Sequence, residues 1–247
     1  MRVRILILIF VLPLLFSLQA SAQTVDDLVG KNIQAHGGLE KLKSLKSVKI
    51  SGKVLAHAGI EIPITLQKKR PNLLRVDLNF QGKDLIQAFD GETGWQTPFV
   101  GTDIQKMTED DLKDIKEQAD FDGPLVDYKE KGNAVELVGK EDMEGTDVYK
   151  LKITLKDGNI RYLYLDGDNA LELKSSGKIK REGTEYDAET FYGNYQTIEG
   201  VTMPFSIEVK VNGQTGQQIT IEKVETNVDM NDSIFKMPAA TQSQPAN

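Results

Sequence analysis

The residue types best suited to metal binding and nucleophilic catalysis are scarce in this sequence. It contains two histidines, His36 and His57, and no cysteine. Neither histidine has a carboxylate or a second histidine at the spacing that zinc ligands use, and thiolate ligands are absent. The lack of cysteine also excludes a disulfide framework, a cysteine nucleophile and a lipid-modified cysteine. We therefore expect neither a metal site nor a thiol-based reaction.

Carboxylates are plentiful, but no spacing singles out a catalytic pair. Residues 166–169, Asp-Gly-Asp-Asn, resemble the start of a calcium loop, yet the glutamate needed at its twelfth position is missing, which favours a hairpin turn. Glu109, Asp110 and Asp111 are typical of a helix N-terminus, where negative charge is favourable. The motifs of serine hydrolases, P-loop proteins and dinucleotide-binding proteins are also absent. These observations predict a protein without catalytic residues or a cofactor.

The N-terminus has the features of an export signal. Arg2 and Arg4 precede an apolar run over residues 5–16, and small residues occupy positions 20–22. This pattern predicts a signal peptide over residues 1–22, cleaved before Gln23, and hence a periplasmic protein; the alternative is that the run stays as a membrane anchor. Loss of the two arginines takes the net charge from −7 to −9. Such an acidic protein is a poor partner for nucleic acid.

Three segments have helical spacing of their apolar residues. Residues 24–35 and 39–45 predict two short helices at the start of the chain. A helical insert is expected at about 108–130, where Thr108 and three acidic residues begin a helix and residues 125–129 form a second short one.

Strands make up the rest of the chain, because the apolar period changes to two from residue 48 onward. We expect about eleven strands joined by short turns, which form an antiparallel meander in a single domain over residues 23–237. Residues 238–247 lack an apolar pattern and are predicted to be a disordered tail. The clearest alternating runs are 48–54, 60–66, 74–80, 135–140, 149–155, 160–165, 171–179, 186–195, 204–211 and 217–224.

The inner face of such a meander leaves two interpretations open. The predicted helices carry apolar stripes of only three or four residues, which is little cover for a sheet of this size. An apolar cavity could therefore remain and bind a lipid-like molecule. The other interpretation is a tightly filled core, and periodicity does not separate the two.

Two motifs suggest a family. Residues 68–74 read Lys-Lys-Arg-Pro-Asn-Leu-Leu, and residues 89–95 read Phe-Asp-Gly-Glu-Thr-Gly-Trp. This pair, followed by residues 97–100, Thr-Pro-Phe-Val, resembles the paired signature of the LolA/LolB-like superfamily of periplasmic lipoprotein carriers. Outer-membrane lipoprotein-sorting proteins of this superfamily also begin with an export signal and a helix that ends in a Gly-Gly run, as residues 36–39 do here. The chain departs from the pattern in its length and in lacking the family's aromatic residue just after the Arg-Pro-Asn turn.

The resemblance implies an unclosed antiparallel β-barrel whose helices form a lid over an apolar cavity that receives acyl chains. In the family, the arginine of the Arg-Pro-Asn turn contacts the lid helices and helps to hold the ligand; the matching residue is Arg70, whose other interpretation is a simple ion pair at a strand end. Trp95 would line the cavity mouth unless it belongs to the core. The ligand-binding candidates are Arg70, Leu74, Val76, Leu78, Phe80 and Trp95.

The function that the resemblance implies is that of a carrier, or chaperone, for lipoproteins or other lipids in outer-membrane biogenesis. Its partners would be the lipoprotein or lipid itself and sorting proteins of the inner and outer membranes. A different class remains open, namely a non-catalytic interaction module of the cell envelope with a filled core, which recruits partners at its strand edges.

Overall fold

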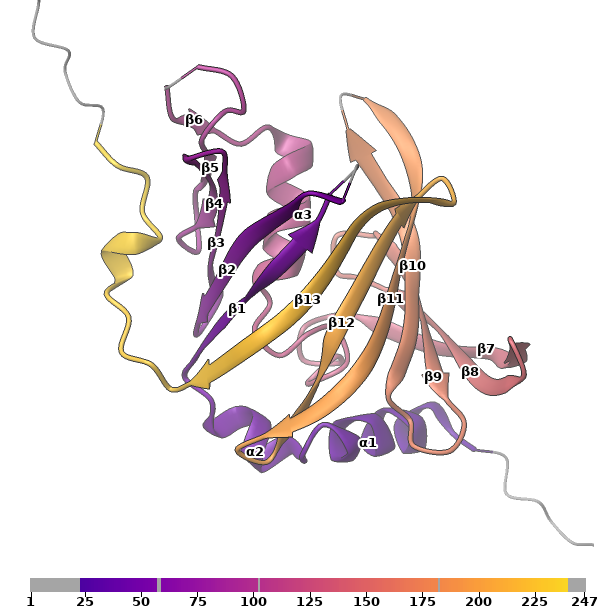
Figure 1. Ribbon diagram of the computed structural model, residues 1–247. Helices are drawn as coiled ribbons and strands as arrows, with labels where there is room; N and C mark the ends of the chain where they lie inside the picture. The colour runs from indigo at the N-terminus through magenta and orange to yellow at the C-terminus, as the bar shows by residue number, and fades with distance from the viewer. Residues whose placement is uncertain (1–22, 57–58, 102, 182, 240–247) are drawn as a thin grey trace, which may run out of the picture.

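The structure is a computed structural model that describes residues 23–56, 59–101, 103–181 and 183–239 (Figure 1). The predicted signal peptide, His57 and residues 240–247 of the predicted tail lie outside the described residues.

A single thirteen-stranded antiparallel sheet dominates the fold. Its strand order is β6-β5-β4-β3-β2-β1-β13-β12-β11-β10-β9-β8-β7, so β6 and β7 are the two edges and the barrel does not close. The sheet curves around a concave inner face (Figure 1). Its strands are β1 (Ser47–Leu55), β2 (Glu61–Lys69), β3 (Leu73–Phe80), β4 (Lys83–Phe89), β5 (Gly94–Gln96), β6 (Gln105–Lys106), β7 (Ala134–Met143), β8 (Thr146–Thr154), β9 (Ile160–Asp166), β10 (Glu172–Arg181), β11 (Thr184–Ile198), β12 (Val201–Val211) and β13 (Gln214–Thr226).

The sequence prediction of an unclosed antiparallel barrel is therefore confirmed, although its count of about eleven strands is too low. No alternating run is predicted for β4, whose sequence Lys-Asp-Leu-Ile-Gln-Ala-Phe does not alternate, or for β5 and β6, which have three and two residues. Strands this short are too brief to show the period of two on which the prediction relied.

The three helices begin where the sequence predicts them. In α1 (Val25–Ala35), Thr24 and Asp27 form a capping box that satisfies backbone N–H groups of the first turn. The next helix is α2 (Leu39–Ser44), and α3 (Glu109–Ala119) is capped by the side chain of Thr108. The short helix predicted at 125–129 is wrong, because that segment is a series of turns with Asp127 in the left-handed region at φ 52°.

Each helix packs against a different part of the concave face. Leu28 and Val29 of α1 join the apolar side chains of β8 and β9 in one buried cluster. Ile115 and Ala119 of α3 form a second cluster with β3 and β4. A third contains the end of α2 together with residues of β1, β12 and β13. Helices α1 and α2 thus lie across one end of the curved sheet (Figure 1).

The convex face is partly covered by the chain after β13. Residues 227–239, with the 3-10 helix η2 (Asp232–Ile234), run along the outside of β1 to β5 (Figure 1). Ser47 Oγ donates to the Val228 carbonyl (2.6 Å), Arg75 Nη1 to the Ile234 carbonyl (2.7 Å) and Trp95 Nε1 to the Phe235 carbonyl (2.8 Å). Phe235 is fully buried. We call residues 227–239 the C-terminal strap.

Gly52 provides a test of the sheet geometry. The pairing of β1 with β13 is irregular at Ser51 and Gly52, and a Cβ at Gly52 would lie 2.2 Å from the Thr220 carbonyl oxygen. That atom belongs to the backbone and cannot move aside. We expect Gly52→Ala to lower the free energy of unfolding by ~1–3 kcal/mol in denaturant titrations. Gly193→Ala in β11 is the control, since a Cβ there would meet nothing within 4 Å. Equal stability of the two variants would contradict this account.

Candidate functional site

The apolar residues of β3 run along the concave face from beneath the helices toward the opposite end of the sheet. Leu74, Val76 and Leu78 pair with Lys68, Leu66 and Ile64 of β2, so all of these side chains share one face. Leu74 is fully buried under α3, whereas Val76, Leu78 and Phe80 are only partly buried. On β3 the inner face is therefore fully buried at Leu74 and only partly covered from Val76 to Phe80.

Partly covered apolar side chains also occur at this end of the neighbouring strands. One row of paired residues crosses five strands on the concave face: Ile62, Val54, Ile219, Ile207 and Tyr192. Val54 is buried, but the other four are only partly buried. A tightly filled core would bury all of them. The inner face thus presents an apolar surface at the end that the helices leave uncovered.

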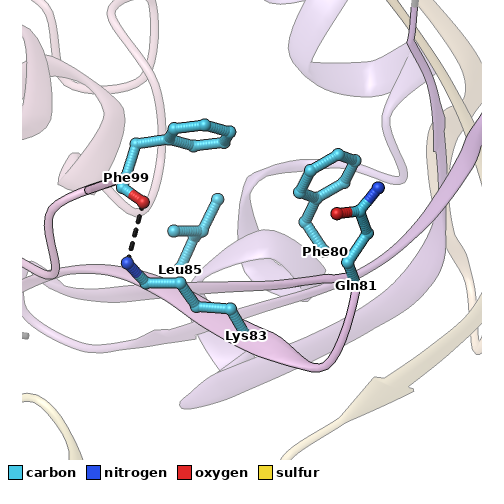
Figure 2. A pocket seen from close by; sticks show the side chains of 5 residues that line it. All are labelled: Phe80, Gln81, Lys83, Leu85 and Phe99. Carbon is cyan, nitrogen blue, oxygen red and sulfur yellow. Dashed lines mark hydrogen bonds between the residues drawn. The ribbon is translucent and has the colours of Figure 1, made fainter. Parts of the chain in front are cut away.

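A hollow of about 210 Å³ lies at this uncovered end, between β3, β4 and the loop after β5. It is lined by Leu85 and by the rings of Phe80 and Phe99, whose centroids are 5.9 Å apart (Figure 2). Lys83 Nζ holds the loop by donating to the carbonyls of Phe99 (2.7 Å) and Gly101 (2.8 Å). Phe99 is 66% exposed and Val100 is 83% exposed, so large apolar side chains edge the open end.

Arg70 lies at the opposite end, where it connects the turn after β2 to the helical segments. Its Nε donates to the Leu45 carbonyl (2.6 Å) and its Nη2 to the Leu42 carbonyl (3.0 Å) at the end of α2. Both terminal nitrogens also donate to the Asp122 carboxylate, just after α3. The guanidinium carbon lies 4.4 Å from the centre of the Phe121 ring. Arg70 therefore contacts both α2 and the segment after α3. It also forms an ion pair at a strand end, as the other interpretation of the sequence expected.

The Asp122 carboxylate is ionised because of these partners. Burial disfavours its charge, but the hydrogen bonds from Arg70 and Lys43 outweigh burial and lower its pKa to about 2. Its side chain is 8% exposed, so an unpaired charge here would be costly.

A second ion pair holds α3 from the other side. Arg161 of β9 donates to both carboxylate oxygens of Glu117, at 2.8 and 2.7 Å. A Cβ at Gly177 of β10 would lie 2.8 Å from the Arg161 side chain, so the glycine leaves the room that this side chain occupies. Helix α3 thus spans the inner face from the apolar contacts of β3 and β4 to the charged contact of β9.

A cluster that sequence reasoning missed holds α1. His36, which follows α1, places Nε2 2.7 Å from Glu172 and Nδ1 2.7 Å from the Thr202 carbonyl. Asn32 donates to Glu172 and to the Ala170 carbonyl, both at 2.9 Å. Both ring nitrogens face groups that only accept hydrogen bonds, so the imidazolium form fits. One sequence feature could have revealed this cluster. Leu28, Asn32 and His36 are spaced four residues apart, which puts them on the same side of the helix.

No protein family and no curated protein matches this chain in sequence. Its fold, however, is similar to solved structures. A LolA superfamily protein from Nitrosomonas europaea superposes with a TM-score of 0.56 at 15% identity, covering 87% of this chain and 98% of that one. The protein has a LolA-like fold. A putative outer membrane lipoprotein-sorting protein domain from Vibrio parahaemolyticus (TM-score 0.55, 10% identity, 84% and 97% covered) and a DUF1329 family protein from Desulfovibrio piger (0.60, 12%, 86% and 97%) are also similar.

The LolA-like fold does not bring all the predicted ligand-binding residues together. Leu74, Val76, Leu78 and Phe80 share the concave face, and Arg70 lies in the turn at its helix-covered end. Trp95 pairs with Ala88, which pairs with Arg75, so Trp95 lies on the convex face under the C-terminal strap. It is 1% exposed, and we leave it out of the proposed site.

Across the part of the chain that the structure describes, no group of three His, Asp or Glu side chains lies close enough to hold a metal ion. Over the same residues, no helix has the length and apolar character needed to span a membrane.

The Arg70 contacts predict a graded loss of stability. We expect Arg70→Leu to lower the free energy of unfolding by about 2 kcal/mol or more at neutral pH, because two carbonyls at the end of α2 lose their donor and the buried Asp122 charge keeps only Lys43. Lys43→Leu should cost less, since Arg70 still pairs with Asp122. Denaturant titration of both variants makes the comparison, and the reverse order would contradict the role of Arg70.

The His36 cluster predicts a pH dependence. Burial opposes the charge of His36, but the hydrogen bond and the negative charge of Glu172 outweigh it and raise its pKa above the usual 6.5. A raised pKa stabilises the fold below pH 6.5, and this stabilisation is lost as the pH rises past the raised value. We expect the free energy of unfolding of the wild type, relative to His36→Gln, to fall by on the order of 1 kcal/mol between about pH 6 and about pH 9. A constant difference would show that the imidazolium is not the stabilising form.

Proposed function

We propose that the protein is a periplasmic carrier that binds the acyl chains of lipoproteins, or a similar lipid-like ligand, on the concave face of its sheet. The observation that carries the proposal is the partly exposed apolar inner face, from Val76 to Phe80 on β3 and across β1, β2, β12 and β13. Each CH₂ group that leaves water contributes ~0.8 kcal/mol, so even partial cover of an acyl chain gives useful affinity.

The LolA-like fold supports this proposal, because proteins described as LolA superfamily and lipoprotein-sorting share the architecture. The export signal predicted over residues 1–22 favours the periplasm. In this role the protein acts as a chaperone and not as an enzyme, and sorting proteins of the inner and outer membranes would load and unload it. The alternative, an envelope module with a filled core, fits poorly with apolar residues left accessible at the inner face.

Substitution of Leu78 tests the ligand surface. Leu78→Gln places an amide on the inner face, where an acyl chain offers it no hydrogen bond. We expect the dissociation constant for a fluorescent fatty acid to rise about tenfold, which corresponds to ~1.4 kcal/mol. Ile86→Gln is the matched control, because Ile86 pairs with Asp77 and lies on the opposite face of the same two strands. It should bind as the wild type does.

Native mass spectrometry of the protein from its own periplasm gives an independent measurement. A co-purifying lipid or acylated peptide would support the carrier and identify its cargo. An empty protein that also fails to take up the fluorescent fatty acid would count against the carrier and in favour of an interaction module.

A further inference from the structure

Lys68 is a partly buried cation on the inner face, flanked by apolar residues of the neighbouring strands. It pairs with Val48 of β1 on one side and with Leu74 of β3 on the other, so its side chain leaves the sheet on the concave face between two buried apolar residues. Its Nζ donates to the Asp120 carbonyl at 3.1 Å, and this is the only hydrogen bond of the ammonium group to another described residue. An ammonium group has three N–H donors, so two are left without a protein partner in this part of the chain.

The carboxylates around Lys68 are already paired. Asp120 accepts from Lys131, at 2.6 and 2.7 Å, and Asp122 is held by Arg70 and Lys43. Asp127 also pairs with Lys43. Among the described residues, no carboxylate lies within ion-pair distance of Lys68. Four cations therefore share three carboxylates, and Lys68 is the one without a counter-charge.

Burial makes this ammonium group unusually easy to neutralise. Burial lowers the pKa of Lys68 to about 8, and the positive charge of Lys131 also lowers it. The negative charges of Asp120 and Asp122 raise this pKa, but by less. An anion beside Lys68 would remove this penalty and supply acceptors for the free donors.

We propose, resting on the proposed function, that the ligand is an amphiphile with an anionic headgroup, a carboxylate or a phosphate, and that Lys68 Nζ binds this headgroup at the helix-covered end of the concave face. The acyl chain then extends along Leu66, Val76, Leu78 and Phe80 toward the open end. From Leu74, opposite Lys68, to Phe80 is six strand residues, or ~20 Å, which gives room for a long chain.

The test compares three probes with the same chain and different headgroups: hexadecanoate, hexadecyl phosphate and hexadecanol. The wild type should bind at least one of the anions about tenfold more tightly than the alcohol, as expected for a charge-assisted hydrogen bond. Whichever anion binds more tightly identifies the headgroup as carboxylate or phosphate. Lys68→Met should remove the preference, and Lys68→Arg should keep it.

A role of Lys68 in stability alone would change the affinity for all three probes together, so the preference for anions is the informative quantity. Lys69→Met is the control, because Lys69 is adjacent in sequence, lies on the convex face and contacts the C-terminal strap. It should leave the preference unchanged.

Equal binding of the anions and hexadecanol by the wild type, or a preference that survives Lys68→Met, would overturn the inference while the carrier function stands. Binding of none of the probes would overturn both.

Discussion

The architecture follows from a mismatch between a large apolar inner face and a small amount of helix to cover it. An open sheet of thirteen strands cannot shield its own concave side, because its edge strands β6 and β7 never meet. Two helices of eleven residues and one of six cover only part of that face and leave side chains such as Ile64 and Leu78 partly accessible. In a protein that only needed stability, this uncovered surface would be a defect. Here it is the surface on which a ligand could be held.

The helices are held to the sheet by charged contacts as well as by apolar ones. Arg70 holds α2 and the chain after α3, Arg161 holds the side of α3 through Glu117, and Glu172 holds the end of α1 through His36. Each of these contacts has defined geometry and can be exchanged for water. Apolar packing of the same area would resist opening more strongly and would also be less specific about position. A cover attached in this way would suit the proposed carrier, which has to admit and release its ligand.

The sequence predicts the strands and helices well because each alternating run has one face against the interior. It fails where that signal is lost, as in β5 and β6, or where buried residues lie in turns, as at Leu125 and Val126. For the site, the period of two places Leu74 to Phe80 on one face but cannot say which face of the sheet is concave. Trp95 shows the same limit, since its burial depends on Phe235, 140 residues later in the chain. The pairing of His36 with Glu172 has the same origin, because 136 residues separate them.

The burial of Trp95 also has an optical consequence. It is the one tryptophan of the chain, and it lies on the convex face, stacked near Arg75 and bonded to the strap at Phe235. Its indole emission therefore reports whether the strap is docked, and it is separated by the thickness of the sheet from the inner face. Quenching or a red shift of this emission would follow release of the C-terminus, while a ligand on the concave face could enter or leave without being seen by this fluorophore.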